Sequence, residues 1–249
     1  MRISPYNTLK QNSWPFPPPS EKSLPELFII ESMDDEDEKS GFFEGVRLAQ
    51  ILRIAGRNPK YYYVQDEREM ELLVPVFRQS NYRYLHVSCH GDTNGFSLTN
   101  GYVGFDRFAE IFGETLKLRR LFVSACQSGQ RELVKSLHKN ARGIQSVTAP
   151  RVKIDYDHAA AIWSAIYLSL LEKSAASCQH DDIIKRLALM MRLFPYSNVE
   201  TQELMSFMFA GYLPNKDKDD SPLPWIFKSI NRTYNLNQAK KPKCKKAHK

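Results

Sequence analysis

The chain has 249 residues, of which 42% are hydrophobic, a size that fits one large domain or two small ones. We expect one domain with a buried core. No apolar run reaches the roughly 18 residues that a membrane-spanning helix needs, and the first residues lack the apolar core of a secretory signal. The composition argues against a membrane or secreted protein and favours a cytoplasmic one.

The formal net charge of +7 comes mainly from the C-terminus. Six lysines fall in the last dozen residues: Lys240, Lys241, Lys243, Lys245, Lys246 and Lys249. Without them the net charge is about +1. We therefore expect a disordered tail that makes weak, non-specific contacts with nucleic acid at most.

Several classes of site lack their motifs in this sequence. The four cysteines (Cys89, Cys126, Cys178 and Cys244) include no C-x-x-C pair, so neither a disulfide framework nor a thiolate zinc site is predicted. Two histidines at metal-binding helix spacing, the G-x-S-x-G turn of serine hydrolases and the glycine-rich nucleotide loops are also missing. We expect no metal and no cofactor.

The elements are predicted in chain order from apolar periodicity and turn residues. An arm at residues 1–24 contains PFPPP, which favours polyproline geometry. Strands are expected at 26–33, 60–65, 82–89, 119–126, 143–149 and 205–213. Helices are expected at 42–54, 67–80, 105–116, 130–140, 156–173 and 181–194, with the acidic run DDEDE as a loop and a hairpin at 94–103.

This alternation of strands and helices predicts the fold class. It is typical of an α/β protein, here a three-layer α/β/α sandwich around a mostly parallel sheet of about six strands. The domain is expected to span residues 25–213. A C-terminal extension, residues 214–249, follows with the aromatic segment WIFKSINRTY and the lysine-rich tail.

Two predicted strands end in residues that suit nucleophilic catalysis. The run HVSCHG ends one strand at His90 and Gly91, and the run LFVSACQSG ends the next at Cys126. Ligands and catalytic groups gather at the carboxyl ends of parallel strands. If the two strands are neighbours, a thiol and an imidazole can share one reacting group.

Gly91 has a separate use in such a site. A glycine lets the main chain approach a substrate, and the backbone N–H groups of Gly91 and Cys126 could hold an oxyanion. The helix predicted after Cys126 would favour thiolate over thiol through its positive N-terminal end. Cys89 should point to the opposite, core side of its strand, and a packed role is favoured for His86.

The two strand ends resemble those of the caspase-like cysteine peptidases, a clan that also includes gingipains, legumains and separases. The block SVTAPRVKIDYDHAAAIWSAIYLSLL, residues 146–171, makes the chain look most like the CHAT branch. The resemblance covers roughly residues 25 to 213. It departs from the caspase motif Q-A-C-x-G, in which the histidine lies about 50 residues upstream, since Ser124 replaces the Gln and His90 lies 36 residues before Cys126.

The resemblance implies a cysteine endopeptidase with a Cys126–His90 dyad that acts on proteins or peptides. It also implies latency until a partner or ligand activates the site, in a bacterial stress or antiphage system. Asp155 and Asp157 lie where similar peptidases build their specificity pocket, so they are candidate substrate-binding residues for a basic side chain. A solvated loop or a helix cap is the alternative for both.

A rival hypothesis remains open at this point. Taken singly, a histidine that caps a strand and a buried small cysteine are both ordinary features. The chain could then be a catalytically inactive caspase-like module that binds a protein partner.

Overall fold

The computed structural model describes residues 23–235, apart from 142, 172–178, 197, 199 and 213–224. Nearly all of the proline-rich arm and all of the lysine-rich tail lie outside the described residues, as do Cys178 and Cys244. No helix among the described residues is long and apolar enough to cross a membrane.

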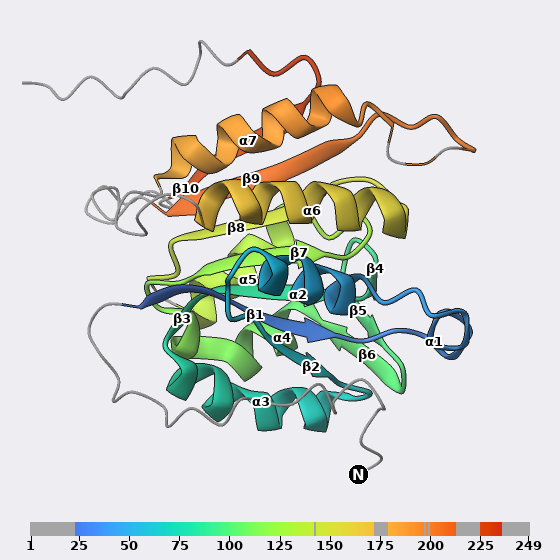
Figure 1. Ribbon diagram of the computed structural model, residues 1–249. Helices are drawn as coiled ribbons and strands as arrows, with labels where there is room; N and C mark the ends of the chain where they lie inside the picture. Colours follow the sequence, from blue (N-terminus) through green and yellow to red (C-terminus); the bar gives the residue numbers. More distant parts are fainter. Residues whose placement is uncertain are drawn as a thin grey trace, which may run out of the picture.

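A seven-stranded sheet forms the centre of the fold (Figure 1). Its strands are β1 (Leu24–Glu31), β2 (Lys60–Tyr63), β3 (Tyr82–Ser88), β7 (Arg120–Ser124), β8 (Ser146–Pro150), β9 (Ser206–Tyr212) and β10 (Trp225–Asn231). Their order is β10-β9-β8-β7-β3-β1-β2. The pairings from β2 to β8 are parallel, and β9 and β10 are antiparallel additions at one edge. The predicted mostly parallel α/β fold is confirmed.

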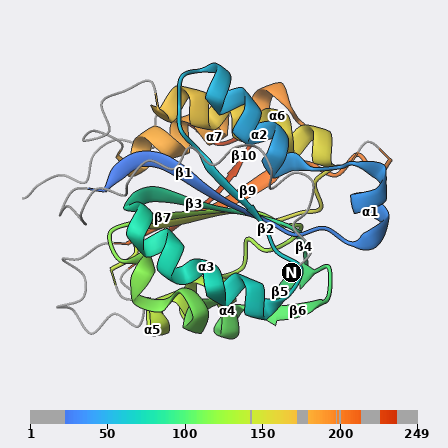
Figure 2. The same ribbon diagram turned by 60° about the horizontal axis from the view of Figure 1, so that its bottom comes forward.

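Helices cover both faces of this sheet, as Figure 2 shows. One face carries α2 (Glu44–Ile54), α6 (Tyr156–Leu171) and α7 (His180–Leu193), and the other α3 (Glu67–Ser80), α4 (Phe105–Phe112) and α5 (Arg131–Asn140). Two separate cores result, one around Trp163 and Tyr167 and one around Phe77 and Phe108. Because both faces are covered, the central strands are buried on both sides; all five residues of β7 are buried.

A small second sheet lies beyond the carboxyl end of β3. It consists of β4 (His90–Gly91), β5 (Gly95–Leu98) and β6 (Gly101–Gly104), in the order β4-β5-β6. β5 and β6 pair antiparallel, which confirms the predicted hairpin. In the ladder between β4 and β5, His90 lies opposite Ser97 and Gly91 lies opposite Phe96, so both residues belong to a strand and not to an irregular loop.

Two elements differ from the sequence-based expectations. The acidic run predicted as a loop forms the short helix α1 (Asp35–Ser40), capped by Asp34, whose carboxylate accepts from the N–H groups of Glu36 and Asp37. The aromatic segment after residue 224 forms β10 and pairs with all of β9, so it adds a seventh strand to the sheet.

Candidate active site

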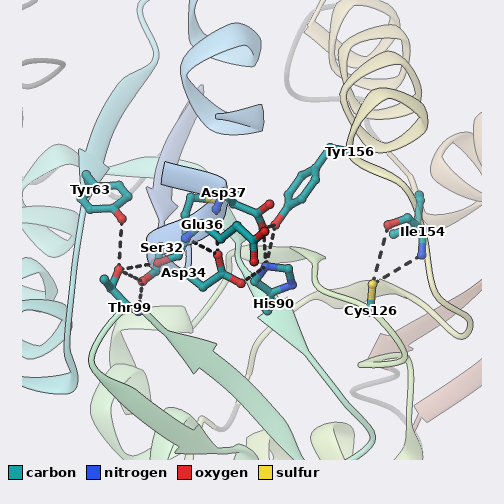
Figure 3. Close-up of polar contacts among 11 residues, drawn as sticks. Ser32, Asp34, Glu36, Asp37, Tyr63, His90, Thr99, Cys126, Ile154 and Tyr156 are labelled. Atoms are coloured by element: carbon teal, nitrogen blue, oxygen red, sulfur yellow. Dashed lines mark hydrogen bonds and ion pairs between the residues drawn. The ribbon is translucent and has the colours of Figure 1, made fainter. Parts of the chain in front are cut away.

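His90 and Cys126 leave the central sheet side by side. β3 and β7 are parallel neighbours with Ser88 opposite Ser124, and the N–H of Cys89 donates to the carbonyl of Ser124 at 3.2 Å. His90 and Cys126 each lie two residues beyond those serines. The predicted juxtaposition at the carboxyl ends of two adjacent strands is therefore present, and Figure 3 shows both side chains in one close-up. Their catalytic role stays a prediction.

Gly91 packs directly against the cysteine loop. A Cβ at this position would lie 2.9 Å from the Cβ of Ala125 and 3.4 Å from the carbonyl oxygen of Cys126. Since real Cβ atoms do not come closer than about 3.0 Å to such neighbours, only glycine fits without a shift of the chain. The close approach that requires glycine is thus to the loop of Cys126. The predicted approach to a substrate and the oxyanion role of Gly91 stay predictions.

The thiol of Cys126 is half-buried against the segment that follows β8. The N–H of Ile154 points at Sγ over 3.5 Å, and the thiol faces the carbonyl of the same residue at 3.7 Å. Burial raises the pKa of Cys126 above its ordinary value, while the Ile154 N–H and the charge of Lys153 lower it in part.

The expected stabilisation of a thiolate by the following helix is wrong for this resting state. Helix α5 starts at Arg131, five residues after Cys126, and the field of a helix end falls off within its first turn. Desolvation then dominates and keeps the pKa of Cys126 above its ordinary value.

The imidazole of His90 is held on its Nε2 side by an acidic group from α1. Nε2 lies 2.6 Å from Oδ2 of Asp37, 3.0 Å from the hydroxyl of Tyr156 and 3.2 Å from Oδ2 of Asp34. The Tyr156 hydroxyl also donates to Oδ2 of Asp37 at 2.9 Å. In Figure 3 the ring lies between this carboxylate and the part of the site that holds Cys126.

Asp34, Asp37 and Tyr156 are the residues that sequence reasoning missed. The signal was available in part, since Asp34 followed by an acidic first turn is a helix-start pattern. Tyr156 falls inside the block that carried the resemblance, but nothing in its spacing predicts a contact 66 residues away.

A buried polar cluster lies beneath the two strand ends. The carboxylate of Glu44, at the start of α2, accepts hydrogen bonds from the hydroxyls of Ser88 at 3.1 Å and Ser124 at 2.6 Å. Its other oxygen lies 3.2 Å from Nε2 of His86, whose Nδ1 lies 2.9 Å from the hydroxyl of Tyr167. His86 is fully buried, as a packed histidine should be, and Cys89 is also buried.

Asp155 and Asp157 border the same region but differ in environment. Oδ1 of Asp155 accepts from the side-chain amide of Asn198 at 3.1 Å, and the charge of Asp155 acts on the Cys126 thiol. Asp157 is exposed, and its carboxylate accepts from the N–H of His158 at 2.7 Å. Helix α6 begins at Tyr156, so Asp157 lies within its first turn and is not its N-cap residue, and the helix-cap alternative is wrong in that form. Of the two carboxylates, Asp155 is the one whose charge acts on the thiol.

Two groups of side chains among the described residues bring possible metal-ligand atoms within 4.8 Å of one another: Asp34 with Asp37 and His90, and Asp155 with Asp157 and His158. The first group already satisfies its atoms through the contacts with His90 and Tyr156. The second is partly exposed. In the second group, Nδ1 of His158 is buried and has no hydrogen-bond partner among the described residues.

Comparison with known proteins bears on the fold of the chain. Neither protein-family models nor curated proteins give a match to the chain. Among solved structures, caspase-1 from Spodoptera frugiperda superposes with a TM-score of 0.51 at 14% identity, over 76% of this chain and 86% of that one. The Arg-specific cysteine proteinase gingipain R has a TM-score of 0.48 at 10% identity, over 76% of this chain and 47% of its own. The fold of the chain is caspase-like.

Proposed function

We propose that the protein is a cysteine endopeptidase of the caspase-like type, nearest to the CHAT branch, with Cys126 as nucleophile and His90 as its proton-transfer partner. The observation that carries the proposal is the position of these two side chains at the ends of adjacent parallel strands, in a fold shared with a caspase. A thiol and an imidazole on neighbouring strand ends suit acyl transfer from a peptide.

The reaction follows from the atoms at hand. As the sulfur attacks the scissile carbonyl, its proton passes to the imidazole of His90, and the N–H groups of Gly91 and Cys126 face the oxyanion. Collapse of the tetrahedral adduct breaks the C–N bond, and the imidazolium gives its proton to the leaving amine. A water molecule then hydrolyses the thioester, which releases the acid and restores the thiol.

Substrate preference is proposed from Asp155. A half-buried carboxylate close to the nucleophile favours an Arg or Lys side chain before the scissile bond, because charge-assisted hydrogen bonds strengthen away from bulk water. Asp157 is kept as a second candidate for the same pocket. Latency until a partner or ligand orders the site is proposed from the resemblance alone. The cytoplasmic location and the bacterial stress or defence setting are proposed on the same ground.

The test is digestion of a complex peptide library by purified protein, read by mass spectrometry. Wild type, Cys126→Ala and Cys89→Ala are run in parallel; Cys89 is the matched control, because it is a free cysteine nearby that points into the core. New termini that need Cys126 but not Cys89 support the peptidase. Identical digests for wild type and Cys126→Ala, with and without candidate activators, favour the inactive interaction module.

A further inference from the structure

Helix α1 projects a carboxylate onto the catalytic-dyad histidine from the opposite side to Cys126. Asp37 reaches Nε2 of His90 at 2.6 Å, a short distance typical of a charge-assisted hydrogen bond. The helix itself has no buried residue. Its docking on the site therefore depends on polar contacts and on the residues that flank it, and not on a hydrophobic face.

We propose that Asp37 and Tyr156 are positioning residues that fix the orientation and tautomer of His90, so that α1 must be docked for the site to work. The proposal rests on the peptidase function above and adds a third component to the dyad. An imidazole whose Nε2–H is bound to a carboxylate presents Nδ1 as the free base. A carboxylate on one ring nitrogen thus selects which nitrogen handles the thiol proton.

Tyr156 secures the carboxylate as well as the ring. Burial, followed by the hydrogen bond to Asp37, raises the pKa of Tyr156 far above its ordinary value, so the hydroxyl stays protonated and donates to Oδ2 of Asp37. The ring of Phe42 stacks on Tyr156 with centroids 5.9 Å apart and planes inclined by 1°. Because Phe42 lies two residues beyond Ser40, the last residue of α1, this stack holds the C-terminal end of the helix.

Asp34 secures the near end of the same helix. One of its oxygens accepts from the N–H of Asp37 at 2.8 Å, and the other lies 3.2 Å from Nε2 of His90. The side chain of Asp37 is 19% exposed, against 55% for that of Asp34. Asp37 is more buried and makes the shorter contact, so we assign to it the orientation of the imidazole. Asp34 supports Asp37 by capping the helix that carries it.

The proton transfers of the proposed reaction are consistent with a positioning role for Asp37. During attack, the thiol proton moves to Nδ1 and the ring becomes an imidazolium, whose new positive charge Asp37 stabilises. During collapse, the same proton leaves Nδ1 for the amine. The Nε2–H stays on the ring throughout, so Asp37 never becomes protonated.

The experiment compares Asp37→Ala, Asp37→Asn and Tyr156→Phe with Asp35→Ala, a control on the same turn with an exposed side chain. Peptidase kinetics are measured on the substrate that the library identifies. We expect kcat to fall roughly 100-fold for Asp37→Ala, less for Asp37→Asn and roughly 10-fold for Tyr156→Phe, with KM nearly unchanged. Asp35→Ala should match the wild type.

A second readout does not require activity. In a Cys126→Ala background, proton NMR should show a downfield, slowly exchanging Nε2–H resonance, assigned to His90 by its loss in His90→Ala. Asp37→Ala should abolish this resonance, and Asp35→Ala should keep it.

The kinetics and the NMR resonance distinguish a failure of the positioning role of Asp37 from a failure of the peptidase function. A wild-type kcat in Asp37→Ala, or a resonance that survives Asp37→Ala, overturns the positioning role while leaving the peptidase intact. If the wild type shows no Cys126-dependent cleavage, the peptidase proposal fails, and the resonance alone then decides whether Asp37 holds the imidazole.

Discussion

The hydroxyl of Ser124 donates to the carboxylate of Glu44 across 2.6 Å, although the two residues are 80 positions apart in the chain. The same oxygen of Glu44 accepts from Ser88 on the neighbouring strand. Because side chains two residues apart lie on one face of an extended strand, Glu44 lies under the strand ends that carry His90 and Cys126. One carboxylate thus ties both strand ends to the first turn of α2.

Removal of this carboxylate should destabilise the fold. Glu44→Ala leaves the hydroxyls of Ser88 and Ser124 and the buried His86 without their acceptor, and such losses cost about 3 to 5 kcal/mol in unfolding free energy. Urea denaturation measures the change. Glu114→Ala, an exposed glutamate, should stay within about 0.5 kcal/mol of the wild type. Equal unfolding free energies for the two variants would show that the hydrogen bonds of Glu44 to Ser88 and Ser124 do not stabilise the fold.

A methyl group at Gly91 should distort the strand end. Gly91→Ala places a Cβ 2.9 Å from that of Ala125 and 3.1 Å from the carbonyl of Gly95, so the chain must shift. Overpacking of this kind costs about 1 to 3 kcal/mol. The paired control is Gly104→Ala, whose Cβ has its nearest neighbour at 3.9 Å. Thermal unfolding should separate the two, and a Gly91→Ala protein as stable as Gly104→Ala would contradict the close packing.

The reactivity of Cys126 should report its raised pKa. Alkylation by iodoacetamide, counted by mass spectrometry at Cys126, should be slower at pH 7 than for an ordinary thiol and should keep rising with pH beyond 9, because only the thiolate reacts. Lys153→Gln should slow the reaction at pH 8, since a positive charge that favours thiolate is lost. Asp155→Asn should speed it, since a negative charge is lost. A shift of both variants in the same direction would refute this electrostatic account.

Glu31 should make the stability of the fold depend on pH. Burial raises the pKa of Glu31 to about 7, although its carboxylate accepts from the N–H of Gly45 and the hydroxyl of Tyr61. The folded state then holds a proton that the unfolded chain releases near pH 4.5. Unfolding free energy should therefore fall as pH rises from 4.5 to 7, by about 3 kcal/mol for a shift of this size.

Glu31→Gln tests that dependence, because glutamine cannot titrate. Its unfolding free energy, measured by urea at a series of pH values, should lose most of the decline between pH 5 and pH 8. Glu114→Gln should retain the wild-type slope. An unchanged slope in Glu31→Gln would assign the pH dependence to another group.

The sequence was informative where a local pattern determines structure. Apolar runs predicted six strands of the main sheet, and the two Asn-Gly turns predicted the β5–β6 hairpin. His90, Gly91 and Cys126 could be grouped because strands of a parallel sheet share one carboxyl edge, so two separate strand ends become one location.

The remaining features depend on tertiary contacts that no local pattern records. Strand β10 is an edge strand that is held by its pairing with β9, and its partly exposed residues lack a buried run. Glu44 follows two phenylalanines at a helix start, where an exposed carboxylate would be ordinary. Its burial depends on serines from two other strands. The raised pKa of Cys126 likewise depends on burial against the segment after β8, which includes Ile154. Nothing in the spacing of the sequence predicted that this segment contacts the thiol.

The order of strands β7-β3-β1 at the centre of the sheet has a consequence for folding. Cys126 follows β7, His90 follows β3 and Asp37 follows β1, so three neighbouring strands each deliver one group. All three groups come from segments distant in sequence, and such non-local pairings form late, because chain entropy must be lost before they gain any contact energy. A chain still emerging from the ribosome, with β7 unpaired, has no complete site. The three groups therefore cannot come together until Cys126 has been synthesised and β7 has paired with β3.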